Sequence, residues 1–112
     1  MCFMKPLRFM GSSRRDLQEF PAIARREAGF QLDHLQCGLN PDDWKPMKTI
    51  GSGVREIRIK DQAGAFRVIY VATFADAVYV LHVFQKKTQT TPLHDIRLAT
   101  SRFRELAEEQ NS

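Results

Sequence analysis

Two arginines in the middle of the chain stand at a spacing that could bind a phosphate. A hairpin centred on residues 61–64 would place Arg58 directly opposite Arg67 on neighbouring strands. Like charges in directly opposed positions destabilise a sheet, and a bound anion would relieve that cost. The planar guanidinium groups suit the non-bridging oxygens of a phosphate. The pattern therefore predicts an anion-binding pair, and a solvated basic surface is the alternative.

Further side chains share the face of the two arginines in this arrangement. A turn near residues 75–76 pairs the second strand with a third. The face then also carries Glu56, Lys60, His82, Phe84 and Lys86. Metal-free RNA cleavage needs a base for the 2′-hydroxyl, charge stabilisation at phosphorus and an acid for the 5′-oxygen. His82, Glu56 and Lys86 are the candidate catalytic residues beside the arginines; a structural histidine and an ion pair of Glu56 with either arginine are the alternatives.

Other residues on or near this face could hold RNA. Phe84 could stack on a base of single-stranded RNA, or the C-terminal helix could cover it. The lysines that could contact a phosphate backbone, or simply be solvated, are Lys45, Lys48, Lys60 and Lys87. His34 and His94 have no recognisable partners. No Ser/His/Asp, Cys/His or carboxylate cluster stands out, so we expect neither a metal nor another cofactor.

The strands that position these residues are predicted from a period of two over residues 54–92. The face opposite the arginines is apolar and reads as a core: Ile57, Ile59, Phe66, Val68, Tyr70, Tyr79, Leu81 and Val83. A slip of one residue would mix this set with the charged one. The hydrophobic pattern therefore supports the register.

The flanking segments predict a short strand and three helices. The strand covers residues 5–10, a brief helix runs from Ser12 or Ser13 to about Phe20, and Pro21 begins a second helix. Its apolar stripe comprises Ala24, Ala28, Leu32, Leu35 and Leu39, and Gly38 with residues 40–43 ends it. We expect a loop over residues 44–53, whose Gly51, Ser52 and Gly53 are turn residues and not a phosphate-binding loop.

The last helix follows Thr91 and Pro92, and its apolar stripe is Ile96, Ala99, Phe103 and Leu106. The fold class is therefore α+β, with an N-terminal strand and helix pair on an antiparallel sheet and a C-terminal helix. The length of 112 residues suits one domain, spanning residues 1–112.

Charge and composition agree with a polyanion as partner. The formal net charge is +4, and residues 44–88 hold eight Lys/Arg against three Asp/Glu. Cys2 and Cys37 have no CxxC or histidine spacing, so we expect reduced thiols. No segment approaches the ~20 apolar residues that span a bilayer. The N-terminus also lacks a signal-peptide core, and we expect a cytoplasmic protein.

Several motifs in this chain resemble the RelE/ParE superfamily of toxins, most closely its phage-derived, HigB-like branch. The resemblance spans roughly residues 5–106. It is specific in the ExR of Glu56–Arg58, the FRVxY of Phe66–Tyr70 and the FxKKTxxTP of Phe84–Pro92. The helix pair before the sheet and the DIRLATSRFREL that follows it fit the same pattern.

The resemblance implies the toxin of a type II toxin–antitoxin operon. RelE-like members cut mRNA in the ribosomal A site without a metal, whereas ParE-like members share the fold and poison DNA gyrase. A non-toxic, phage-derived binding protein is a third possibility. In the HigB-like branch the antitoxin is typically a helix-turn-helix protein encoded beside the toxin. The implied partners are therefore that antitoxin, the ribosome and mRNA, with no membrane and no small-molecule cofactor.

Family positions carry over to only some residues of this chain. Arg58 and Arg67 match basic strand positions of RelE-like enzymes, and Lys86 or Lys87 matches a basic position at the end of the last strand. Glu56 stands where RelE has a lysine implicated in proton transfer. No tyrosine follows Tyr79, so the C-terminal tyrosine that RelE stacks on its substrate has no counterpart.

Overall fold

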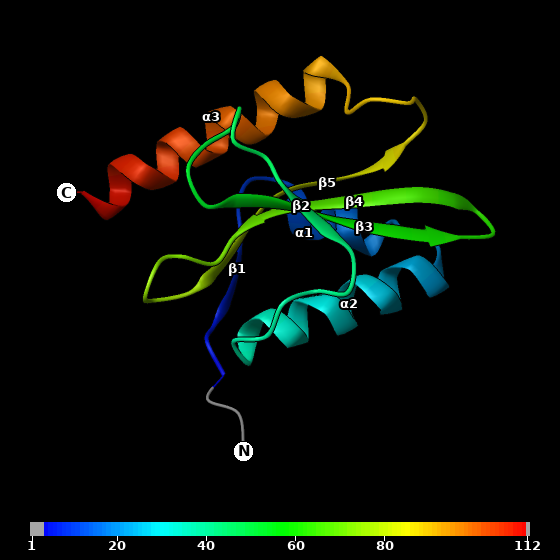
Figure 1. The fold of residues 1–112 in the computed structure, drawn as a ribbon, viewed down its shortest axis with the longest axis horizontal. Coiled ribbons are helices and arrows are strands. Elements are labelled where there is room, and N and C mark those ends of the chain that lie inside the picture. Colours follow the sequence, from blue (N-terminus) through cyan, green and yellow to red (C-terminus); the bar gives the residue numbers. More distant parts are fainter. Residues whose placement is uncertain (1–3, 112) are drawn as a thin grey trace.

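The computed structural model describes residues 4–111, which form one sheet with helices on both of its faces (Figure 1). The elements in chain order are β1 (Leu7–Phe9), α1 (Ser13–Gln18), α2 (Ala22–Gln36), β2 (Trp44–Pro46), β3 (Val54–Asp61), β4 (Gly64–Val71), β5 (Val78–Lys86) and α3 (Leu93–Gln110). The fold is α+β, as predicted. None of the helices in residues 4–111 combines the length and the apolar character needed to cross a membrane.

The five strands are ordered β1-β5-β4-β3-β2, and the sheet is mixed, because β1 runs parallel to β5. The expectation of a purely antiparallel sheet is therefore wrong at this edge. A strand also replaces part of the loop expected over residues 44–53, since Trp44–Pro46 pairs with β3. Three residues that include a proline are too short to show a period of two. Pairing with β3 alone makes this segment a strand.

The predicted register is confirmed around the two arginines. Arg58 pairs with Arg67 across β3 and β4, and Arg67 pairs with Phe84 across β4 and β5. The β4–β5 ladder shifts at Ile69/Tyr70, however, so that Tyr70 faces Val80. A shift of one residue exchanges the two faces beyond it.

Because of this shift, Tyr79 and Leu81 do not belong to the apolar face on which they were predicted. Both are buried in a second core beneath α3, together with Val54, Ile69, Val71 and Ala99. The face that carries the arginines is therefore charged at one end and apolar at the other. Its apolar end is covered by α3.

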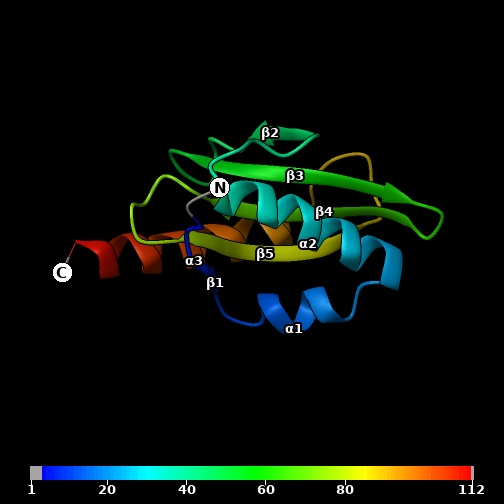
Figure 2. The same ribbon diagram turned by 90° about the horizontal axis from the view of Figure 1, so that it is seen from below.

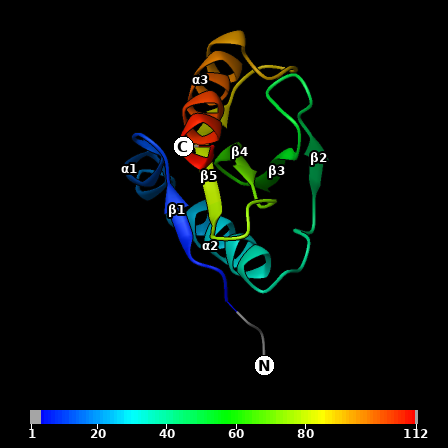
Figure 3. The same cartoon turned by 90° about the vertical axis from the view of Figure 1, so that its left-hand side faces the viewer.

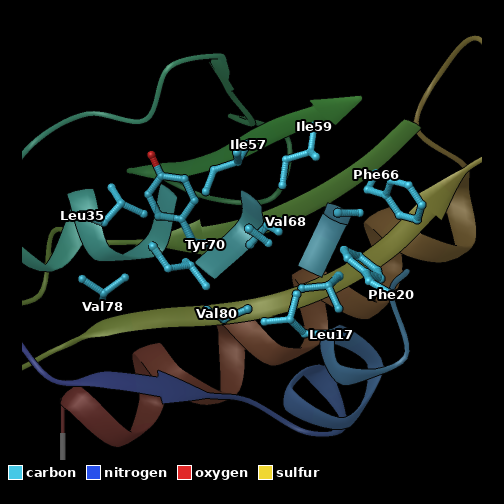
Figure 4. Close-up of a cluster of buried hydrophobic side chains, with 14 residues drawn as sticks. Leu17, Phe20, Leu35, Ile57, Ile59, Phe66, Val68, Tyr70, Val78 and Val80 are labelled. Atoms are coloured by element: carbon cyan, nitrogen blue, oxygen red, sulfur yellow. The ribbon is translucent and has the colours of Figure 1, made fainter. Parts of the chain in front are cut away.

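The sheet separates two cores (Figures 2 and 3). In the first, α1 and α2 cover the face that carries Ile57, Phe66, Val68 and Tyr70 (Figure 4). The stripe of α2 lies in this core as predicted, except that Leu39 is 57% exposed. The helix ends at Gln36, so Leu39 no longer follows the helical repeat.

The turn at Gly51 contacts α3 closely enough to make a testable difference. A Cβ atom added at Gly51 would collide with the ring of Phe103. We expect Gly51→Ala to displace α3 and lower the melting temperature, because overpacking typically costs ~1–3 kcal/mol. Gly29→Ala is the control, since Gly29 lies within α2 with open space around it. There the melting temperature should rise, because glycine inside a helix is unfavourable by roughly 0.5–1 kcal/mol. Equal shifts for both variants in thermal unfolding would contradict this packing.

The cysteine prediction is wrong for Cys37, which is disulfide-bonded. Cys2 lies outside the described residues. The backbone N–H of Lys5 donates to the carbonyl of Gln36 at 2.9 Å, and the Gln36 side chain donates to the carbonyl of Lys5 at 2.7 Å. The N-terminal segment thus lies against the end of α2, a contact that cysteine spacing alone does not reveal.

Candidate nucleic-acid interface

A fully buried carboxylate, that of Glu56 on β3, forms the centre of the charged end of the sheet. Its Oε1 atom lies 3.5 Å from Nε of Arg67 and 3.8 Å from Nζ of Lys45. Its Oε2 atom accepts a hydrogen bond of 3.1 Å from the hydroxyl of Thr91. Burial of a charged group is costly unless the group is paired, and these contacts make Glu56 the internal counterion of this cluster.

Arg67 is the most buried cation of the cluster, with 5% of the residue exposed. Burial lowers the pKa of its guanidinium, Glu56 raises it, and Arg58 lowers it again. One terminal nitrogen donates to the carbonyl of Phe66 at 3.0 Å. Among the described residues, neither Nε of Arg67 nor Oε1 of Glu56 makes a hydrogen bond. The contact with Glu56 and the bond to Phe66 therefore hold the guanidinium in place.

Arg67 lies in a hollow of about 520 Å³ at the surface. Its lining consists of Ala65, Arg67, Lys86, Lys87, Thr88 and Gln89. Desolvation and the nearby Arg67 charge lower the pKa of Lys86, and Glu56 partly offsets them. Cations and hydroxyl or amide groups thus surround an open space. Such a site can contact the phosphate oxygens of a nucleic-acid backbone.

Arg58 takes a different direction from Arg67 although the two residues are paired. Its Nε and one terminal nitrogen contact Oδ1 of Asp43, at 3.0 Å and 2.9 Å. Each arginine thus has a carboxylate of its own, Asp43 for Arg58 and Glu56 for Arg67. The like-charge cost that pointed to a bound anion is therefore relieved within the protein. Arg58 does not line the hollow.

His82 also lies outside the hollow and joins the sheet to α3. Its Nε2 atom is 2.6 Å from Oδ1 of Asp95, and its Nδ1 atom is 3.5 Å from a terminal nitrogen of Arg102. Phe84 stacks on the imidazole with ring centroids 5.3 Å apart and packs against the core under α3. His82 therefore lies in a hydrogen-bonded structural environment, and Phe84 packs beneath α3. These are the alternatives to catalysis and to RNA stacking that the sequence offered for the two residues.

The surroundings of His82 predict how stability depends on pH. Burial lowers its pKa from the ordinary value, although Asp95 raises it, so the folded protein favours the neutral imidazole. The unfolded chain then binds more protons below about pH 6.5. We expect the stabilisation that depends on neutral His82 to be complete above that pH. On acidification the free energy of unfolding should fall, by no more than ~1.4 kcal/mol per pH unit.

Urea unfolding of the wild type and of His82→Gln, which keeps a hydrogen-bonding group beside Asp95, measures this dependence. The variant should lose less stability than the wild type between pH 7.5 and pH 5.5. Identical pH slopes would show that His82 is not the titrating group.

The two remaining lysines lie away from the hollow. Lys60 is exposed near the end of the β3–β4 hairpin, beside a separate pocket of about 280 Å³ whose lining includes Asp42, Asp43 and Asp61. Lys48 is exposed in the turn before β3. Of the predicted site residues, the structure gathers Glu56, Arg67, Lys86 and Lys87 at one place.

The sequence alone assigned no part in the site to Thr88, Gln89 or Thr91. It left Lys45 as either a contact to a phosphate backbone or a solvated lysine, and not as a partner of Glu56. Lys45 pairs with Glu56 across β2 and β3, but β2 shows no strand pattern of its own. The threonines stand in the KKTQTTP motif, which was the available signal. In residues 4–111, no group of three or more His, Cys, Asp or Glu side chains could hold a metal ion.

Comparison with known protein families assigns this chain to one of them. No curated protein matches its sequence. Residues 15–104, which include all of the lining of the hollow, match the family described as phage derived protein Gp49-like (DUF891). This span covers well over half of the 112 residues. The chain therefore belongs to the phage-derived Gp49-like family, a family of type II toxins related to the RelE/ParE-like toxins.

Proposed function

We propose that this protein is the toxin of a type II toxin–antitoxin system and that it inhibits translation by cleaving mRNA on the ribosome, without a metal. Within the superfamily we place it in the HigB-like branch, on the motifs around Glu56, Arg67 and Lys86. The cell compartment is then the cytoplasm, where ribosomes and mRNA are found.

One observation carries this proposal: the excess of cations around the hollow. Lys45, Arg67 and Lys86 surround the single carboxylate of Glu56, and Lys87 adds a further charge at the rim. This local excess favours an anion with several oxygen atoms. The phosphodiester backbone of single-stranded RNA supplies such an anion, and the open hollow admits a chain that enters and leaves.

The chemistry assigned to the hollow is attack of a ribose 2′-hydroxyl on the adjacent phosphorus. The 2′-hydroxyl gives its proton to a solvent water in the open hollow, the bond from phosphorus to the 5′-oxygen breaks, and the products are a 2′,3′-cyclic phosphate and a 5′-hydroxyl end. Arg67 would neutralise the charge that develops on the non-bridging oxygens. Lys86, whose lowered pKa makes it a better proton donor, would protonate the departing 5′-oxygen. Glu56 is too buried to touch RNA and would orient Arg67 instead.

Induced expression in a bacterial host followed by mapping of transcript ends tests this function. We expect translation to stop and mRNA to be cut at positions in register with codons. Intact mRNA with DNA-damage signalling and filamentation would instead indicate a gyrase inhibitor. Unimpaired growth at verified expression would leave only a non-toxic binding protein and would overturn the proposal.

The proposed protein partner is a helix-turn-helix antitoxin encoded by the adjacent gene. A cationic surface that stops translation must be covered in the resting cell, and acidic or apolar segments near α3 would do this. Co-expression of the two genes and size-exclusion chromatography should show a single complex. Separate elution at micromolar concentrations would count against this partner.

A further inference from the structure

We infer that Thr91 is a positioning residue of this site, and that its hydroxyl fastens the wall of the hollow to the buried carboxylate that holds Arg67. The inference rests on the proposed RNA cleavage for its effect on activity. The contact itself can be tested without any activity.

The wall in question is the loop over residues 87–92, which joins β5 to α3 (Figure 1, yellow to light orange). Lys87, Thr88 and Gln89 line the hollow from this loop, and residues 87–90 are exposed. The hydroxyl of Thr88 donates to the carbonyl of Thr90 at 2.6 Å, a bond within the loop. In the described part of the chain, the bond from Thr91 to Glu56 is the one hydrogen bond between this loop and the sheet.

Glu56 is the acceptor of this bond, and its two carboxylate oxygen atoms make different contacts. Oε2 accepts from Thr91, whereas Oε1 faces Arg67 and Lys45 without a hydrogen bond of its own. Rotation of the carboxylate would therefore change the Arg67 contact and the Thr91 contact together. A hydrogen bond to a charged group is worth more than one between neutral groups.

The single bond from Thr91 thus sets two features of the hollow at once. It fixes the orientation of the carboxylate behind Arg67, which would bind the scissile phosphate. It also fixes the base of the loop that presents Lys87 and Thr88 to the same phosphate. Without the hydroxyl, the loop would open and Arg67 would lose its fixed direction, although the sheet itself would remain folded.

Three variants separate this role from simple packing. Thr91→Val keeps the shape of the side chain and removes the hydroxyl. Thr91→Ser keeps the hydroxyl. Thr90→Val is the matched control, because the Thr90 side chain makes no hydrogen bond to the sheet in the described part of the chain.

Hydrogen–deuterium exchange in the first turn of α3 reports the contact, because the backbone N–H groups of Asp95 and Ile96 donate to the carbonyl of Pro92 at the end of this loop. We expect Thr91→Val to exchange at least about tenfold faster at these amides than the wild type, the factor that a lost bond to a charged group implies. Thr91→Ser and Thr90→Val should exchange at the wild-type rate, and the rates in β3 and β4 should not change. Equal exchange in Thr91→Val and the wild type would overturn the inference.

Cleavage of a single-stranded RNA on ribosomes tests the consequence for the site. Thr91→Val should lower kcat by about tenfold or more with a smaller change in KM, and Thr91→Ser should restore it. Faster exchange in the first turn of α3 together with unchanged cleavage would overturn the positioning role. If the wild type does not cleave RNA, the proposed function fails. In that case the exchange experiment still decides whether Thr91 fastens the loop.

Discussion

Arg67→Ala is expected to lower the rate of RNA cleavage by ~10²-fold or more, the loss seen when one stabilising donor is removed from a transition state. Arg67 is the one arginine that lines the hollow in the described part of the chain, and its contact with Glu56 holds the guanidinium in place. Cleavage in a ribosome assay and growth inhibition after induction both measure this loss.

The structure changes what the same variant should do to stability. The opposed arginines by themselves suggest that removing one would leave stability unchanged or slightly higher, because like charges repel. The contact between Arg67 and buried Glu56 predicts the opposite, since breaking a buried ion pair from one side typically costs ~3–5 kcal/mol. A loss of activity in Arg67→Ala must therefore be corrected for the folded fraction.

A double variant separates the two effects. Arg67→Met with Glu56→Gln replaces both charges by neutral groups of similar size, and such replacements are often neutral for stability or better. We expect its melting temperature to approach that of the wild type while cleavage remains as low as in Arg67→Ala. Recovery of cleavage together with stability would show that Arg67 has only a structural role.

Arg58→Ala and the Arg58→Ala/Arg67→Ala double variant then test whether the two arginines act as one unit. A shared site predicts a severe loss from either single change and little further loss in the double variant. Arg58 lies against Asp43 and outside the hollow, so the structure favours a smaller effect for Arg58. Toxicity that survives in a well-folded Arg58→Ala variant would restrict the phosphate contact to Arg67.

Glu56→Gln alone should lower stability as strongly as Arg67→Ala, because it breaks the same buried ion pair from the other side. The amide can still accept from Thr91, but the charge that compensates Arg67 and Lys45 is gone. A buried, uncompensated guanidinium predicts a loss of ~3–5 kcal/mol in the free energy of unfolding. Urea denaturation at neutral pH measures it.

Asp43→Asn provides the matched control for Glu56→Gln. It also removes one carboxylate from one arginine, but Asp43 and Arg58 have side chains that are 57% and 40% exposed. Exposed ion pairs are worth about 0–1 kcal/mol. We therefore expect a change within that range, and equal losses in the two variants would contradict the assignment of Glu56 as the buried counterion.

The sequence by itself determined the register of the central hairpin. The period of two in residues 54–71 separates charged from apolar residues, so a slip of one residue would mix the two sets, and the turn at residues 61–64 sets which of the remaining registers forms. Arg58 therefore pairs with Arg67, as the pattern predicts. The helices follow in the same way from local stripes and from Pro21 and Pro92, although each proline stands one residue before its helix and is not its first residue.

The tertiary structure decided which of these residues meet. The irregularity at Ile69/Tyr70 moves Tyr79 and Leu81 under α3, and no local pattern marks it. Besides Arg67 on β4, Glu56 has one partner on β2, 11 residues earlier, and one in the loop before α3, 35 residues later. The side chain of Arg58 likewise contacts Asp43, whereas that of Arg67 lines the hollow. Periodicity reports the face on which a residue lies, but its partner there depends on contacts between segments distant in sequence, which only the folded chain provides.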